Sequence, residues 1–145
     1  VSRVFGGSVS DWIGGENTAI LALATLLVGA VLMTVSHSHP LSVIGESVMA
    51  LGMGVNNAAV FKLVPQEVPK AVGGAAGWVG GLGAFGGFVI PPVMGVFVRE
   101  QGDIGYAWGF VIFIALAILC LALTYVLKLT HVMQEVPSGS SPSLR

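Results

Sequence analysis

An arginine near the start of the chain, Arg3, is the side chain best suited to hold a small charged ligand. It lies in the stretch VSRVF, eight residues before Asp11, a separation of about 12 Å along a helix axis. A planar guanidinium can donate two parallel hydrogen bonds to a planar oxyanion, which lysine cannot do. We therefore predict that Arg3 binds an anion. The alternative is an interfacial arginine that extends its charge to water.

A glycine-rich stretch, GWVGGLGAFGGFVIPP at 77–92, is the second unusual feature. Glycine costs about 1 kcal/mol relative to alanine inside a helix, so its concentration here needs a reason. Residues three or four apart share a helix face, and two rows of glycine have this spacing: Gly73, Gly77 and Gly81, and Gly80, Gly83 and Gly87. These rows allow either tight helix packing or a bare backbone beside a crossing solute. Pro91 and Pro92 are expected to end or bend the helix.

Other polar residues in apolar surroundings have two interpretations each. Asn56 and Asn57 contact a substrate, or they hydrogen-bond between helices. Glu46 is a proton-coupling carboxylate or a partly hydrated acid. His37 and His39 are interpreted as solvated loop residues, because two histidines without a third ligand make a poor metal site. No metal and no cofactor is predicted.

The composition indicates that lipid surrounds these residues. Of the 145 residues, 54% are hydrophobic and 9% are charged, whereas a soluble domain carries about 25% charged residues. A domain of this size buries only about 70% of its surface, which is too little to hide so much apolar area in water. The net charge of −1 provides no basic field for nucleic acid. Catalytic patterns such as GxSxG and HExxH are missing from the sequence, so we do not expect an enzyme.

Four segments have the roughly 20 apolar residues that a membrane-spanning helix needs. They are 18–35, 41–64, 72–98 and 106–129. Residues 1–9 are too short to span and are interpreted as the end of a truncated helix. The sequence therefore predicts an all-α membrane protein with four transmembrane helices plus the end of a fifth. The tail at 131–145 is rich in Ser and Pro and is expected to be disordered.

Basic residues in the connections predict the orientation in the membrane. Cytoplasmic loops carry an excess of lysine and arginine. One side carries Lys62, Lys70, Lys128 and Arg145, and the other carries only Arg99. Residues 65–70, the loop at 6–15 and the C-terminus are therefore predicted to be cytoplasmic.

Three sequence blocks together carry a family resemblance. In chain order they are Arg3 with GGSVSDWIGG (6–15), GMGVNNAAVFKLVP (52–65) and the glycine-rich stretch (77–92). The first loop resembles the cytoplasmic loop between the second and third helices in each half of a major facilitator superfamily transporter. All three blocks, over roughly residues 1–98, resemble the nitrate/nitrite porter family. The resemblance implies a twelve-helix fold, in which residues 1–130 run from the end of helix eight to helix twelve and the N-terminal half is missing.

The resemblance also implies roles for individual residues. The substrate-binding arginine of that family falls on Arg3, and the residues that line its helix ten fall near Gly54, Asn56 and Asn57. Glycines of its signature fall on Gly77, Gly80, Gly81, Gly83, Gly86 and Gly87. We expect the first four of these glycines to line the substrate path. Roles in helix packing or gating are expected for Gly73, Gly86, Gly87, Pro91 and Asp11.

The implied function is secondary active transport of nitrate and/or nitrite across the cytoplasmic membrane by alternating access, as part of a longer protein. The loop departs from the family pattern at Trp12 and Glu16, where basic residues are common, which affects gating contacts more than the substrate site. Two alternatives remain. The substrate could be another small anion or an organic solute, or the chain could be a structural piece that does not transport.

Overall fold

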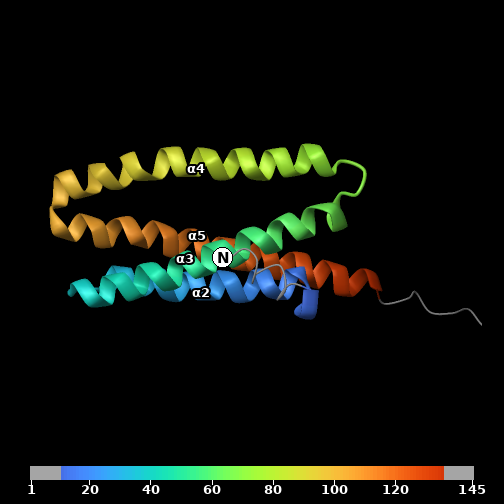
Figure 1. Ribbon diagram of the computed structural model, residues 1–145, viewed down its shortest axis with the longest axis horizontal. Coiled ribbons are helices and arrows are strands. Elements are labelled where there is room, and N and C mark those ends of the chain that lie inside the picture. The colour runs from blue at the N-terminus through green and yellow to red at the C-terminus, as the bar shows by residue number, and fades with distance from the viewer. Residues whose placement is uncertain (1–10, 136–145) are drawn as a thin grey trace, which may run out of the picture.

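The computed structural model describes residues 11–135, which form long helices joined by short connections (Figure 1). Helix α2 spans Gly15–Val35, α3 spans His39–Glu67, α4 spans Val72–Gln101 and α5 spans Asp103–Glu135. All four are long and apolar enough to cross a membrane, which confirms the four predicted spans. Helix α5 continues to Glu135, so residues 131–135 of the expected tail are helical. The expected end of a fifth helix, including Arg3, and residues 136–145 lie outside the described residues.

Helix α2 lies at the centre of the contacts between the described helices. It packs most extensively on α3 and next on α5, whereas α4 contacts α5 moderately and α3 least. Figure 1 shows α4 running along one side, apart from the other three over most of its length. None of the residues of α4 is buried. The bundle is therefore tight around α2 and open around α4.

Small residues repeated every seven positions explain why α2 and α3 pack so closely. Two buried rows have this spacing: Gly15, Ala22 and Gly29 on α2, and Gly45, Gly52 and Ala59 on α3. Seven residues are close to two helical turns, so each row stays on one face. In lipid the hydrophobic effect does not hold helices together, and small residues permit the close backbone approach that does.

The closeness of this contact can be judged from the space beside two of the glycines. A Cβ atom added at Gly29 would lie 2.5 Å from the backbone nitrogen of Met49. One added at Gly52 would lie 2.6 Å from the backbone nitrogen of Leu26. Both distances are far below van der Waals contact, so no side chain fits at either position without separating the helices.

The prolines of α4 do not end the helix. Pro91 and Pro92 lie inside it, and α4 continues to Gln101. Proline has a φ that fits a helix but no N–H to donate, and membrane helices tolerate it within their length. The helix ends instead at Gly102, whose φ of +63° is in the left-handed region and whose N–H bonds to the Val98 carbonyl at 2.9 Å.

Candidate substrate pathway

Apart from Arg3, which lies outside the described residues, the predicted substrate-binding residues lie on two helices that have little contact with each other. Gly54, Asn56 and Asn57 are on α3, and the signature glycines are on α4. One glycine lies near α3, because a Cβ added at Gly80 would be 4.0 Å from Cζ of Phe61. Within the described part of the chain, the candidate residues therefore lie on two separate helix faces and do not surround one enclosed site.

The glycine face of α4 is open. A Cβ added at any of the other signature glycines, or at Gly73, would meet nothing within 4 Å: Gly77, Gly81, Gly83, Gly86 and Gly87. A hollow of about 520 Å³ follows this face and is lined by Gly73, Gly74, Gly77, Trp78, Gly81 and Leu82. The predicted glycine row with a spacing of four residues (Gly73, Gly77 and Gly81) lines this hollow. The bare backbone is thus accessible, and it either contacts a solute or receives another helix.

Asn56 carries a buried acceptor that lacks a donor. Its Oδ1 atom is buried and has no hydrogen-bond partner among the described residues. Asn56 follows Gly52 by four residues and precedes Ala59 by three, which places it on the side of α3 that faces α2. An unsatisfied buried polar atom costs about 1–3 kcal/mol. The Oδ1 atom of Asn56 therefore needs a hydrogen-bond donor from outside the described residues.

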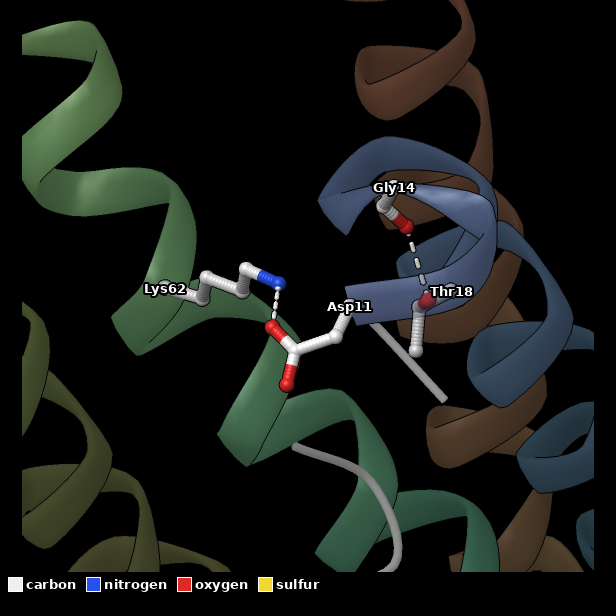
Figure 2. Close-up of polar contacts among 4 residues, drawn as sticks. All are labelled: Asp11, Gly14, Thr18 and Lys62. Atoms are coloured by element: carbon white, nitrogen blue, oxygen red, sulfur yellow. Dashed lines mark hydrogen bonds and ion pairs between the residues drawn. The ribbon is translucent and has the colours of Figure 1, made fainter. Parts of the chain in front are cut away.

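Polar contacts join three segments at one end of the bundle, which we call the lysine end. Lys62 of α3 forms an ion pair with Asp11, which precedes α2 (Figure 2). Lys128 of α5 donates a hydrogen bond of 2.6 Å to Oδ1 of Asn17. The buried hydroxyl of Thr18 donates to the Gly14 carbonyl at 2.7 Å, a contact within the first turn of α2 (Figure 2).

Asp11 was predicted to serve gating, but its partner was not identified from the sequence. The side chain of Lys62 is 30% exposed and that of Asp11 is 70% exposed. Exposed ion pairs contribute only about 0–1 kcal/mol, so this pair can form and break at low cost. The sequence feature that could have indicated this pairing is the opposite charge of Asp11 and Lys62, which are both predicted at the same membrane face.

A cavity of about 910 Å³, lined by both polar and apolar side chains, lies at the opposite end of the bundle, where the α2–α3 connection meets the start of α5. Its polar lining residues are Thr34, Ser36, His37, Ser38, His39, Ser42 and Tyr106, and we call it the histidine cavity. The sequence did not predict it, because it forms only when α5 lies beside residues 36–38. Within the described part of the chain, no three His, Cys, Asp or Glu residues are grouped to hold a metal ion.

Comparison with known sequences places this helical membrane protein in a family. The profile of the Major Facilitator Superfamily matches residues 1–143. The chain therefore belongs to the Major Facilitator Superfamily, a family of multi-pass membrane transporters. This result supports a transport role and not an enzymatic one.

Several similar curated proteins are named as nitrate transporters. The "Probable nitrate transporter NarT" of Staphylococcus epidermidis is 31% identical over 98 residues, which cover 68% of this chain and 25% of that protein. The protein of the same name from Staphylococcus aureus strain JH9 is 30% identical over 122 residues, which cover 83% of this chain and 30% of that protein. The chain thus spans about a quarter to a third of the length of these relatives. No solved structure matches it significantly.

Proposed function

We propose that this chain is part of a secondary transporter that moves nitrate and/or nitrite across the cytoplasmic membrane by alternating access. The open glycine face of α4 is the observation that supports this most directly. Its support for these two anions in particular comes from the similarity to proteins named as nitrate transporters. In the proposed orientation the lysine end and the C-terminus are cytoplasmic, in accordance with the excess of basic residues there.

The glycine face would act as a wall that fits a small, flat anion. Nitrate is about the size of a peptide group, and a helix without side chains on one face lets such an ion approach the backbone directly. Gly77, Gly80, Gly81 and Gly83 are the positions proposed for this contact. Binding near the midplane between two halves, with rocking about the site, is the general scheme for such transporters.

Arg3 would supply the charge that holds the anion. Its guanidinium offers two parallel donors to two oxygen atoms of the ion. On the α3 side, Gly54 leaves space, and the amide groups of Asn56 and Asn57 offer further donors. Only the Nδ2 group of Asn56 can donate to the anion; its buried Oδ1 atom is an acceptor without a partner among the described residues, and it needs a donor from another part of the longer protein.

The ion pair between Asp11 and Lys62 would serve as a gate contact at the cytoplasmic end. It links the segment before α2 to the end of α3, two elements of the same half, which in this proposal separate from each other when the cytoplasmic side opens. Because the pair is largely exposed, breaking it costs about 1 kcal/mol or less, which is compatible with a contact that breaks in every transport cycle.

Nitrate uptake by the longer transporter that contains this chain tests the proposal. In Arg3→Lys we expect the loss of one charged, bidentate contact to weaken anion binding about 10- to 100-fold, with normal membrane insertion. Arg99→Lys, the same change at the end of α4, is the control and should leave uptake unchanged. Unlabelled nitrite, chlorate and formate should be added as competitors. Normal uptake by Arg3→Lys would contradict the role of Arg3, and failure of nitrate and nitrite to compete would contradict the substrate class.

A further inference from the structure

The histidine cavity presents hydrogen-bond donors that the chain does not use itself. Among the described residues, the side chains of His37, His39 and Tyr106 make no hydrogen bond, and all three are exposed. Their N–H and O–H groups are therefore free to donate to a ligand. No carboxylate is present among the described side chains that line the cavity. The unused donors, together with the lack of a carboxylate among the described lining residues, favour an anion over a cation.

Hydroxyl groups hold the connection that forms one wall of the cavity. The hydroxyls of Ser36 and Ser42 hydrogen-bond to each other at 2.8 Å. The same two hydroxyls lie 3.1 Å (Ser36) and 3.2 Å (Ser42) from the Ser38 carbonyl oxygen. Because each hydroxyl has one proton, one of them donates to this carbonyl while the other donates to its partner hydroxyl. These contacts fix residues 36–38 against the first turn of α3. His37 is thus carried on a connection with a defined conformation, and His39 is the first residue of α3 and not a loop residue as expected.

We propose that the histidine cavity binds a small oxyanion and collects substrate at the membrane face opposite the lysine end. The identification of that anion as nitrate or nitrite rests on the proposed function, whereas binding itself does not require transport. A volume of about 910 Å³ is in the range of ligand sites and exceeds what one bare small anion fills. The cavity therefore admits a hydrated ion and acts as an antechamber of low affinity.

Acid pH is expected to strengthen this binding. A protonated imidazole carries a positive charge and attracts an anion more strongly than a neutral imidazole does. The other titratable group in the lining is Tyr106. Outside the lining, Glu46 lies on α3, Arg99 and Glu100 lie near the end of α4, and Asp103 begins α5. Any pH effect that these groups cause persists in histidine variants, so the histidine contribution is the part of the effect that such variants lose.

Binding can be measured directly with the 145-residue chain in lipid nanodiscs, using NMR signals of labelled histidine. Sodium nitrate is titrated at pH 5.5 and at pH 8, and sodium chloride at equal ionic strength is the screening control. We expect the signals of His37 and His39 to shift with nitrate, with an apparent Kd about fivefold lower at pH 5.5. Two opposite unit charges about 4 Å apart in water attract each other by about 1 kcal/mol, which corresponds to about a fivefold change in Kd. The signal of His131, near the far end of α5, should not shift.

The matched variants are the double change His37→Gln with His39→Gln, and the control His131→Gln. In the longer transporter, the double variant should raise the KM for nitrate about fivefold at pH 5.5 and much less at pH 8, with an unchanged maximal rate. The control should change neither value.

The outcomes separate the two proposals. Histidine shifts without any nitrate uptake would contradict the proposed function and support the antechamber. Normal KM values together with unshifted histidine signals would overturn the antechamber, even if transport is confirmed. Equal shifts with chloride would overturn the assignment to an oxyanion.

Discussion

The close contact between α2 and α3 gives the most quantitative prediction for this protein. Adding one methyl group at Gly29 would place a Cβ 2.5 Å from the Met49 nitrogen, 2.7 Å from its Cα and 2.8 Å from its Cβ. None of these atoms can move by changing a rotamer, so the two helices must separate. We therefore expect Gly29→Ala to destabilise the chain.

Gly81→Ala is the matched control, because it adds the same methyl group inside a helix where nothing lies within 4 Å. Both changes gain the same helix propensity, about 1 kcal/mol, and this gain cancels when the two variants are compared. The remaining difference is the cost of overpacking, typically about 1–3 kcal/mol. Gly29→Ala should therefore have a free energy of unfolding about 1–3 kcal/mol lower than that of Gly81→Ala.

A third variant tests whether the rigidity of the contacted atoms matters. A Cβ at Gly15 would lie 2.7 Å from Cδ2 of Leu63 and 2.9 Å from its Cγ. These atoms belong to a flexible side chain that can turn away, so Gly15→Ala should fall between the other two variants. The assay is unfolding of the 145-residue chain in mixed micelles with increasing dodecyl sulfate, followed by circular dichroism. Equal stability of Gly29→Ala and Gly81→Ala would refute the close packing of α2 on α3.

Two further predictions concern polar groups. Asp11→Lys and Lys62→Asp each place like charges in the pair at the lysine end. Each variant should slow nitrate uptake up to about fivefold, while its free energy of unfolding changes by less than about 1 kcal/mol. The double variant that swaps the two charges should restore the uptake rate, and a double variant slower than either single change would exclude a gate contact. Asn56→Leu removes the acceptor that lacks a donor and should stabilise the isolated chain by about 1 kcal/mol, measured by the same unfolding assay. The same change should weaken nitrate uptake in the longer transporter, and unchanged uptake would exclude Asn56 from the substrate path.

The sequence by itself determined the four membrane spans and the bare face of α4. Spans are predictable because the thickness of the bilayer sets a length of apolar chain, and this requirement is local. The face formed by Gly73, Gly77 and Gly81 is predictable because residues four apart share a face whatever the neighbours are. The end of α4 was less predictable, since Pro91 and Pro92 are compatible with a helix that continues to Gln101.

Only the tertiary structure decided which small residues are in close contact. The sequence drew attention to the crowded glycines of α4, yet the close backbone contacts are at Gly29 and Gly52, whose seven-residue rows are less conspicuous. The pairing of Lys62 with Asp11 and the histidine cavity also depend on which helices become neighbours. The physical reason is that lipid solvates every apolar face of a membrane helix equally well, so hydrophobicity does not mark the face that packs. That choice is made by backbone shape and by a few polar groups, after the helices have formed.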